Sequence, residues 1–435
     1  MTTSLSRRRF LKRTGQAAVG VKLLSYAGPA WAVSPNDKLN IGMIGTANQA
    51  RYDLNNVASE NIVALCDVDE NLLNAAGEKF PAAKKYSDFR EILARNDIDA
   101  VVIGTPDHTH AVITSAALHS GRHTYCEKPL ARTIGEVRAV TELAHRKGLV
   151  TQIGTQIHGG NNYRRVVELV QSGAIGDIKE VHVWVGGGFG GKTLPKETPP
   201  VPKNLNYDLW LGPVEYRPFS PEYLPFTWRN WWAFGGGTLA DLGCHHVDLS
   251  HWALGLRTPN KVRVVDGPTP DPECPPTWLI VEYEYARPKM AAGNPADPIK
   301  LTWYHGDKRP HHFAEGLLPK WGNGTLFVGS KGMLLADYDK HALLPEKDFA
   351  GFKAPTPFIA NSIGHHKEWI EACKGRGKTL CGFDYSGPLT EAVLLGNVAF
   401  RTGKALEWDS KRMRASNAAA ADTYIQYKYR KGWAL

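Results

Sequence analysis

The sequence lacks several features that would each indicate a particular class of protein. After residue 32 it has no apolar run approaching the roughly 20 residues that a membrane-spanning helix needs, so we expect no stable membrane insertion. It has no internal repeat, which excludes a repeat architecture. Its six cysteines form no paired Cys-x-x-Cys framework, so we expect free buried thiols, with Cys373 and Cys381 as the one pair to check for a disulfide.

Outside the N-terminal segment the sequence also has only a small excess of positive over negative charge. The formal net charge is +9, but residues 1–32 hold six Arg and Lys and no Asp or Glu, which leaves +3 for the rest. No basic stripe interleaved with aromatics follows, so we expect no nucleic-acid partner. The 435 residues are 43% apolar and 22% charged, which indicates a globular body of about two domains.

The N-terminal segment resembles a twin-arginine signal peptide. Residues 6–12 read SRRRFLK, a weakly apolar stretch spans residues 17–27, and residues 30–32 read AWA, as at a cleavage site. We therefore predict that residues 1–32 are cleaved, that the twin-arginine export machinery is a partner, and that the protein is periplasmic. This route carries folded proteins, which suits an enzyme that must take up a cofactor in the cytosol. The alternatives are a basic amphipathic N-terminus or a membrane anchor.

The apolar pattern divides the rest of the chain in two. Between residues 33 and 155 short apolar strands alternate with helices, which predicts an α/β fold with a Rossmann-type, doubly wound parallel sheet. Residues 156–435 contain several strands in succession, which predicts a C-terminal α+β domain with a large, mostly antiparallel open sheet. The Gly/Pro-rich stretch 186–203 is expected to form a long loop over the site. The predicted strands span 39–45, 62–67, 100–104, 123–126, 150–154, 178–185, 261–265, 278–285, 299–304, 325–328 and 333–337.

A dinucleotide-binding layout begins the first domain. Gly45 opens the turn after the first strand, and Asp67 ends the second strand about 20 residues later, where an acid binds ribose hydroxyls. Ala50 at the third glycine position is an accepted variant, whereas Ala47 at the second costs clearance for phosphate. Asp67 would repel a 2′-phosphate, which favours NAD over NADP, although Arg51 keeps NADP possible. Alternatively, Asp67 is a turn acid that caps the next helix.

Four segments resemble a known family. They are TPDHTH at 105–110, GRHTYCEKPLA at 121–131, GTQ at 154–156 and GGGTLADLGCHHVD at 235–248. From about residue 38 to 409 the chain is similar to the Gfo/Idh/MocA oxidoreductases. The resemblance implies tightly bound NAD(P), a sugar or polyol substrate, an open sheet that often forms oligomer contacts in a dimer or tetramer, and catalytic roles for Lys128, Asp241 and His245. With the turn, it assigns to the cofactor site Gly45, Thr46, Ala47, Asn48, Asp67, Thr105, Pro106, His110, Glu127 and Gln156.

The three catalytic candidates suit the oxidation of an alcohol, which must lose a proton from oxygen and a hydride from carbon. Histidine transfers protons near neutral pH, so His245 is suited to the first task. Asp241 lies four residues earlier on a predicted helix, on the same face, where it would orient the ring. Lys128 would stabilise the developing alkoxide. Alternatively, the acid is a helix N-terminal charge, the histidine belongs to the core and the lysine is solvated.

Two further predictions concern metal and substrate. Cys244, His245 and His246 are clustered, but on a helix they point in different directions, and other histidine pairs are adjacent residues that chelate poorly, so we predict no metal. The aromatic segment 228–232 would stack on a sugar or else pack between domains. The substrate candidates are Tyr163, Arg229, Trp231 and His246.

The sequence leaves three functions open. The first is an exported NAD(P)-dependent oxidoreductase that acts on a sugar, polyol or sugar derivative. The second is a redox-neutral enzyme that retains NAD and cleaves a glycoside through a transient keto-sugar. The third is a non-catalytic sugar-binding protein, hinted at by Ala47. The complete catalytic set argues against the third.

Overall fold

The computed structural model describes residues 38–289, 293–294 and 297–435. The predicted signal peptide, residues 1–32, lies outside the described residues, as does the start of the linker that follows it. Within the described ranges, no helix combines the length and the apolar character needed to cross a bilayer.

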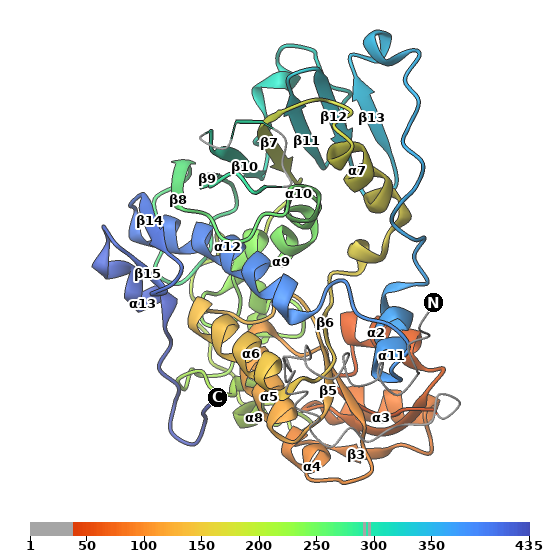
Figure 1. Ribbon diagram of the computed structural model, residues 1–435. Coiled ribbons are helices and arrows are strands. Elements are labelled where there is room, and N and C mark those ends of the chain that lie inside the picture. The colour runs from red at the N-terminus through yellow and green to blue at the C-terminus, as the bar shows by residue number, and fades with distance from the viewer. Residues whose placement is uncertain (1–37, 290–292, 295–296) are drawn as a thin grey trace, which may run out of the picture. The chain divides into compact units, whose positions relative to one another are not determined.

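The first sheet has six parallel strands in the order β3-β2-β1-β4-β5-β6 (Figure 1). This order and the helices between the strands confirm the predicted Rossmann fold. In such sheets a nucleotide binds outside the carboxyl ends of the strands, where the strand order reverses, here between β1 and β4. The elements are β1 (Asn40–Ile44), α2 (Gln49–Val57), β2 (Asn61–Cys66), α3 (Glu70–Lys79), β3 (Lys84–Tyr86), α4 (Phe89–Leu93), β4 (Ala100–Ile103), α5 (Asp107–His119), β5 (His123–Cys126), α6 (Ile134–Lys147) and β6 (Thr151–Ile153).

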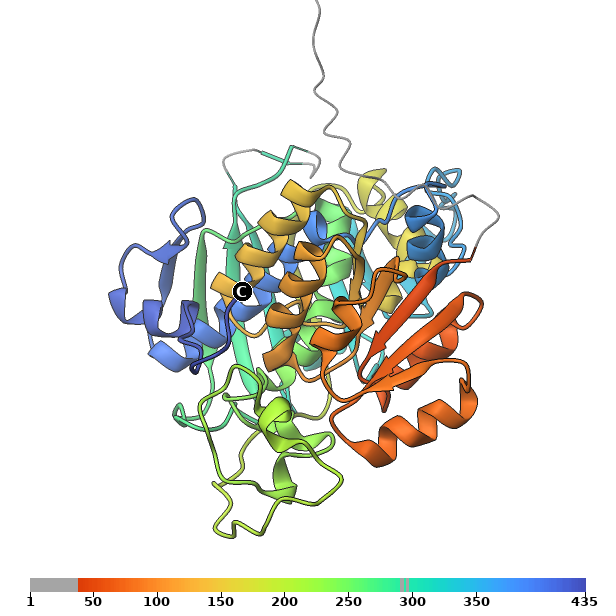
Figure 2. The same ribbon diagram turned by 90° about the horizontal axis from the view of Figure 1, so that it is seen from below.

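The second sheet has nine strands in the order β13-β12-β11-β7-β10-β9-β8-β14-β15. All neighbours are antiparallel except β7 and β10, which confirms the predicted mostly antiparallel sheet. Figure 2 shows its green and cyan strands apart from the red and orange strands of the first sheet. The strands are β7 (Ile178–Trp184), β8 (Lys261–Asp266), β9 (Leu279–Tyr285), β10 (Ile299–His305), β11 (Gly324–Gly329), β12 (Gly332–Ala336), β13 (His341–Leu344), β14 (Leu406–Asp409) and β15 (Arg414–Ala415).

Helices cover one face of this second sheet. Val181 and Val183 of β7 and Tyr283 of β9 point toward them and join the largest hydrophobic cluster of the chain. The alternate residues of β7 point to the opposite face, because side chains alternate along a strand. The helices of this half are α7 (Asn161–Gln171), α8 (Tyr207–Leu211), α9 (Gly237–His246), α10 (Asp248–Leu254), α11 (His365–Cys373), α12 (Phe383–Thr402) and α13 (Asp422–Ile425).

Two late helices tie the halves together. Helix α11 packs against α2, and its Trp369 meets Tyr125 of β5 edge to face. Helix α12 packs against α6 (Figure 1, Figure 2), where the Arg138 guanidinium makes two hydrogen bonds to the buried Glu391 carboxylate. The chain thus crosses back twice to the first domain, which fixes the position of one half against the other.

Local chemistry sets the ends of helix α6. Thr133 caps its first turn, and the Glu136 carboxylate accepts a hydrogen bond from the Thr133 N–H in return, which is a capping box. Gly148 ends the helix in the left-handed region, at φ 62°, where a side chain would be strained. All six cysteines are buried and free, which confirms the expected thiols and leaves Cys373 and Cys381 unbridged.

Candidate active site

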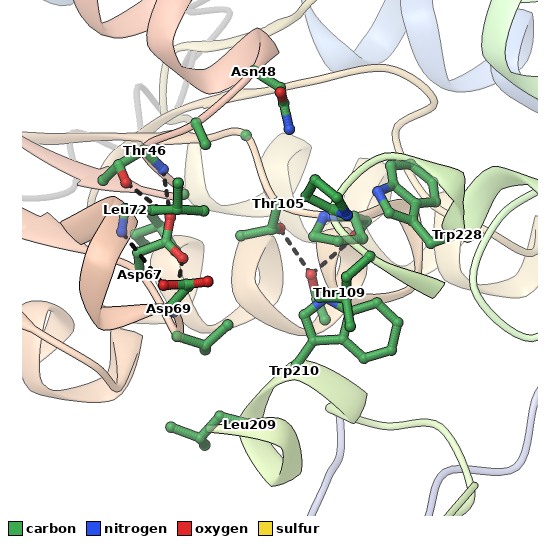
Figure 3. Close-up of a pocket in the computed structure, with 18 of the residues that line it drawn as sticks. Thr46, Asn48, Asp67, Asp69, Leu72, Thr105, Thr109, Leu209, Trp210 and Trp228 are labelled. Carbon is green, nitrogen blue, oxygen red and sulfur yellow. Dashed lines mark hydrogen bonds between the residues drawn. The ribbon is translucent and has the colours of Figure 1, made fainter. Parts of the chain in front are cut away.

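A cleft of about 430 Å³ lies at the carboxyl ends of β1, β2 and β4. Figure 3 shows Thr46, Asp67 and Asp69 on one side of it. Trp210 and Trp228, which follow the Rossmann domain in the sequence, lie on the other side (Figure 3). The predicted site residues that line it are Gly45, Thr46, Ala47, Asn48, Asp67, Thr105, Pro106, Glu127, Lys128 and Arg229.

The turn after β1 is tightly packed against β4. Gly45 has φ +88°, and a Cβ there would approach the Gly104 carbonyl oxygen to 2.8 Å, so only glycine fits. Gly104 itself faces Ala50, because a Cβ on Gly104 would lie 2.6 Å from the Ala50 Cβ. The Ala50 methyl group, at the third glycine position, therefore fits because Gly104, directly after β4, has no side chain.

Asp67 binds this turn. One of its carboxylate oxygens accepts hydrogen bonds from the Thr46 N–H at 2.9 Å and the Thr46 hydroxyl at 2.8 Å, and the other accepts the Asp69 N–H at 3.1 Å. Burial raises the pKa of Asp67, while these hydrogen bonds oppose the shift. The cap of the next helix, α3, is Asp69, so Asp67 is not the capping acid that the alternative interpretation required.

The crevice fits a dinucleotide. The first turn of α2 carries no acidic residue, and within the described part of the chain the N–H groups of Ala47 and Asn48 make no hydrogen bond. A helix N-terminus with free N–H groups attracts a pyrophosphate. The second Asp67 oxygen carries a single hydrogen bond and retains capacity for a ribose hydroxyl.

At the other end of the cleft three charged side chains converge. The Lys128 Nζ donates to Asp241 Oδ1 at 2.6 Å, and the Arg229 Nε donates to the same oxygen at 2.9 Å. All three side chains are nearly buried. Burial opposes the charge on Lys128, yet the carboxylates of Asp241 and Glu127 raise its pKa above the usual value. Burial would raise the pKa of Asp241, but the two cations hold it well below its usual range. Lys128 is therefore an ammonium and a donor.

Aromatic side chains hold Arg229 in place. Its guanidinium lies 4.1 Å from the Trp228 ring centroid and 4.4 Å from that of Phe226. Both aromatic residues line the cleft, as Arg229 does. The cation is thus fixed by stacking on one side and by Asp241 on the other, which positions Lys128 as well.

His245 lies one turn after Asp241 on α9 and is half-buried. Its ring makes no hydrogen bond within the described part of the chain. The expected bond from Asp241 is not formed, and the Asp241 Oδ1 instead accepts from Lys128 and Arg229. Burial, and then the charge of Lys128, lower the pKa of His245 well below its usual value. The ring is neutral at pH 7 and can accept a proton.

Asp107 is a site residue that sequence reasoning missed. It lines the cleft at the start of α5, and burial raises its pKa to about 8, against the opposing charges of Arg229 and Lys128. Its carboxyl is therefore mostly protonated at neutral pH and can donate a hydrogen bond. The signal was present, since Asp107 follows Pro106 at the end of a buried strand, within the TPDHTH segment.

Two predicted cofactor residues stand behind the cleft and do not line it. The Gln156 amide donates to the Glu127 carboxylate at 2.5 Å and to the Tyr125 hydroxyl at 3.0 Å. The buried His110 ring lies 2.7 Å from both the Thr105 and Pro129 carbonyl oxygens. Both side chains therefore hold residues that line the cleft, since Gln156 binds Glu127 and His110 binds the Thr105 carbonyl.

Three predicted substrate residues also lie away from the cleft. Trp231 is buried in an aromatic cluster, edge-on to Tyr223. The buried Tyr163 hydroxyl donates to the His245 carbonyl oxygen, and His246 stacks on Tyr338 and shares a 2.9 Å hydrogen bond with its hydroxyl. Packing therefore accounts for all three, as the alternative interpretation of the aromatic segment proposed for Trp231, and of the four candidates only Arg229 lines the cleft.

Known proteins match both halves of the chain. Residues 39–155 match the family model described as oxidoreductase family, NAD-binding Rossmann fold, and residues 160–291 match that of the oxidoreductase family, C-terminal alpha/beta domain. Inositol 2-dehydrogenase of Salmonella typhimurium is 31% identical over 187 residues, 41% of this chain and 54% of that protein. A glycosyl hydrolase family 109 protein of Shewanella baltica is 26% identical over 204 residues, 40% of this chain and 44% of that protein. The chain thus spans about half the length of these curated relatives.

A solved structure matches nearly the whole chain. The WlbA dehydrogenase of Bordetella pertussis, in complex with NADH and UDP-GlcNAcA, has a TM-score of 0.60 at 17% identity, over 86% of this chain and 99% of that one. At this identity the likeness shows the fold alone. The two family models together cover more than half of the sequence, and the chain belongs to the Gfo/Idh/MocA oxidoreductase family, with an NAD-binding Rossmann domain at its N-terminal end.

Proposed function

We propose that this chain is an exported oxidoreductase that uses tightly bound NAD to take a hydride from a CH–OH group of a sugar, polyol or sugar derivative, or to return a hydride to the corresponding carbonyl. The observation that carries the proposal is the buried Lys128–Asp241–Arg229 network at the end of a dinucleotide cleft, with neutral His245 beside it. The inositol 2-dehydrogenase relative supports a polyol-like substrate. Export by the twin-arginine route is proposed from residues 1–32.

The chain supplies proton chemistry and positioning. Bound NAD provides the hydride acceptor. The neutral His245 ring accepts the proton of the substrate hydroxyl, and the Lys128 ammonium donates a hydrogen bond to the oxygen as negative charge develops there. Asp241 holds that ammonium charged and in place. The protonated Asp107 carboxyl offers a second donor from the cofactor side of the cleft.

The aromatic wall fits a small carbohydrate. Trp210, Trp228 and Phe226 line the cleft opposite the Rossmann strands. Aromatic faces pack against the C–H groups of sugar rings, while Arg229 offers N–H donors to hydroxyls or to a carboxylate. A homo-oligomer, dimer or tetramer, is proposed from the family resemblance.

A second candidate function is redox-neutral cleavage of a glycoside through a transient keto-sugar, with NAD reduced and then reoxidised in place. The glycosyl hydrolase family 109 relative favours it. The proposed export also favours it, because free nicotinamide cofactor is not expected outside the cytosol. The same lysine, histidine and aspartate serve both functions, so the site alone does not distinguish them.

One pair of measurements distinguishes these functions. The purified protein is denatured and the supernatant is assayed for NAD(H); about one equivalent per chain is expected. The intact protein is then given polyols, free sugars and oligosaccharides. Net NADH accumulation supports the first function, and cleavage without net cofactor change supports the second. If the protein held no NAD(H), did not bind added NAD(H) and turned over none of these compounds, both functions would be contradicted.

A further inference from the structure

A cluster of metal-binding side chains lies on the second sheet, outside the cleft. Glu180 and His182 are two residues apart on β7 and share one face, because side chains alternate along a strand. Their neighbours Val181 and Val183 point into the helix-covered core. His312 approaches from the short 3-10 helix His311–Phe313. One ligand atom of each of the three lies within 4.8 Å of the other two.

Each of the two histidines of this cluster has a buried ring nitrogen without a hydrogen-bond partner. His182 and His312 are 4% and 5% exposed, and their Nε2 and Nδ1 atoms, respectively, make no hydrogen bond within the described residues. A buried polar atom without a partner is costly, so two such atoms in one cluster need an explanation. A single cation between them would satisfy both.

The second ring nitrogen of His182 has the kind of hydrogen-bond partner found in metal sites. The His182 Nδ1 lies 3.0 Å from the Tyr304 hydroxyl, while the Nε2 lies 3.5 Å from the Glu180 carboxylate. When Nδ1–H donates to Tyr304, the Nε2 lone pair points into the cluster. Metal-binding histidines commonly donate their second N–H to such a partner, which fixes the tautomer and the ring orientation.

The carboxylate lies at the edge of the cluster, because the Glu180 side chain is 40% exposed whereas both histidines are buried.

We propose that Glu180, His182 and His312 bind a divalent transition-metal ion, for which Zn²⁺ is the natural probe. Two imidazoles and one carboxylate are ligands that Zn²⁺ prefers, and three protein ligands leave room for water. In this proposed set only one histidine comes from the pair His311-His312, and the other, His182, comes from β7.

The ion would fasten a covering segment to the sheet. The chain around residues 311–321 already lies against β7, since Phe313 meets Trp184 edge to face and the Trp184 indole N–H donates to the Trp321 carbonyl oxygen at 3.1 Å. None of the three ligands lines the catalytic cleft. The metal therefore serves stability, and catalysis by the cleft does not depend on it.

The test uses the full-length protein, stripped with a chelator and dialysed against Zn²⁺. Plasma mass spectrometry is expected to find about one zinc per chain, and thermal unfolding is expected to shift upward on zinc addition. His182→Gln, His312→Gln and Glu180→Gln should each weaken zinc binding more than the roughly 10–100-fold caused by losing a partner that only orients a ligand. His119→Gln, at an exposed position on α5 away from the cluster, is the matched control and should bind zinc normally.

Two outcomes overturn the proposal. In the first, the wild-type protein holds no more zinc than His182→Gln and shows no thermal shift, so that the cluster is only a pair of packed histidines. In the second, His119→Gln loses zinc as fully as the three ligand variants, so that the loss is not specific to this cluster. Unchanged NAD binding in all four variants shows that each has folded, so that lost zinc reflects the ligands.

Discussion

The two ends of the cleft are built differently. The nucleotide end uses backbone N–H groups, close glycine contacts and one acid, Asp67, all within a continuous stretch of chain. The catalytic end uses three buried charges: Lys128 follows β5, whereas Arg229 and Asp241 lie more than 100 residues later, in the 3-10 helix Thr227–Asn230 and in α9. A site made from backbone tolerates changes such as Ala47, whereas a site made from mutually dependent charges is expected to fail when one member is removed.

The largest effect is expected at the catalytic end, from Lys128→Ala. Loss of the ammonium removes the donor to the developing alkoxide and leaves Asp241 with one cation, so kcat should fall by about 10²–10³-fold. NAD binding, measured by calorimetry, should change little. The matched control is Lys404→Ala, at an exposed position. Near-normal turnover by Lys128→Ala would refute the catalytic assignment.

Asp241→Asn tests the dependence between these charges. Because Asp241 raises the pKa of Lys128, the asparagine variant should have a lower lysine pKa, and the ammonium should be lost at a lower pH. We expect the alkaline limb of the kcat/KM profile to move to lower pH, with a fall of about tenfold to a hundredfold near neutrality. An alkaline limb that stays in place would show that Lys128 does not depend on this carboxylate.

At the nucleotide end a smaller effect is expected. Asp67→Asn keeps one acceptor for the turn but loses charge, so NAD affinity should fall by about tenfold and the preference for NAD over NADP should narrow. Titration with both cofactors measures the two effects. Asp384→Asn, an exposed acid, is the control. An unchanged preference between the two cofactors would remove Asp67 from cofactor selection.

The smallest effect is expected at Asp53, behind the cleft, and concerns the pH dependence of the free energy of unfolding. Burial raises the pKa of Asp53 to about 7, beside the buried Glu127 carboxyl, so folding favours its protonated form. Its contribution to stability is therefore complete below the unfolded pKa near 4 and is lost as the pH rises through about 7. Asp53→Asn should reduce that loss, by on the order of 1 kcal/mol at pH 8. Urea unfolding at pH 5 and pH 8 measures it; an equal pH dependence in both proteins would contradict the shift.

The sequence predicted the fold and the NAD cofactor, for a physical reason. The alternation of strands with helices and the spacing from Gly45 to Asp67 involve residues close together in the sequence, so they can be recognised without knowledge of the fold. Helix α12 contains Pro388 in its interior, since packing against α6 and α9 outweighs one lost hydrogen bond.

The catalytic end was predictable only in part. The motifs predicted Lys128, Asp241 and His245, and the i, i+4 spacing predicted that Asp241 would orient His245. Only the fold shows that Asp241 accepts instead from Lys128 and from Arg229, which was predicted as a substrate residue. Trp231 was misplaced because an aromatic segment looks the same in sequence whether it packs in a core or lines a cleft.

The most direct test is a crystal structure of the full chain with NAD⁺ bound. The account predicts the pyrophosphate at the N-terminus of α2, near Ala47 and Asn48, and the nicotinamide ring beside Lys128 and Asp107, with the His245 ring facing the same space. A nicotinamide ring bound away from Lys128, with His245 opening into a separate cavity, would contradict it.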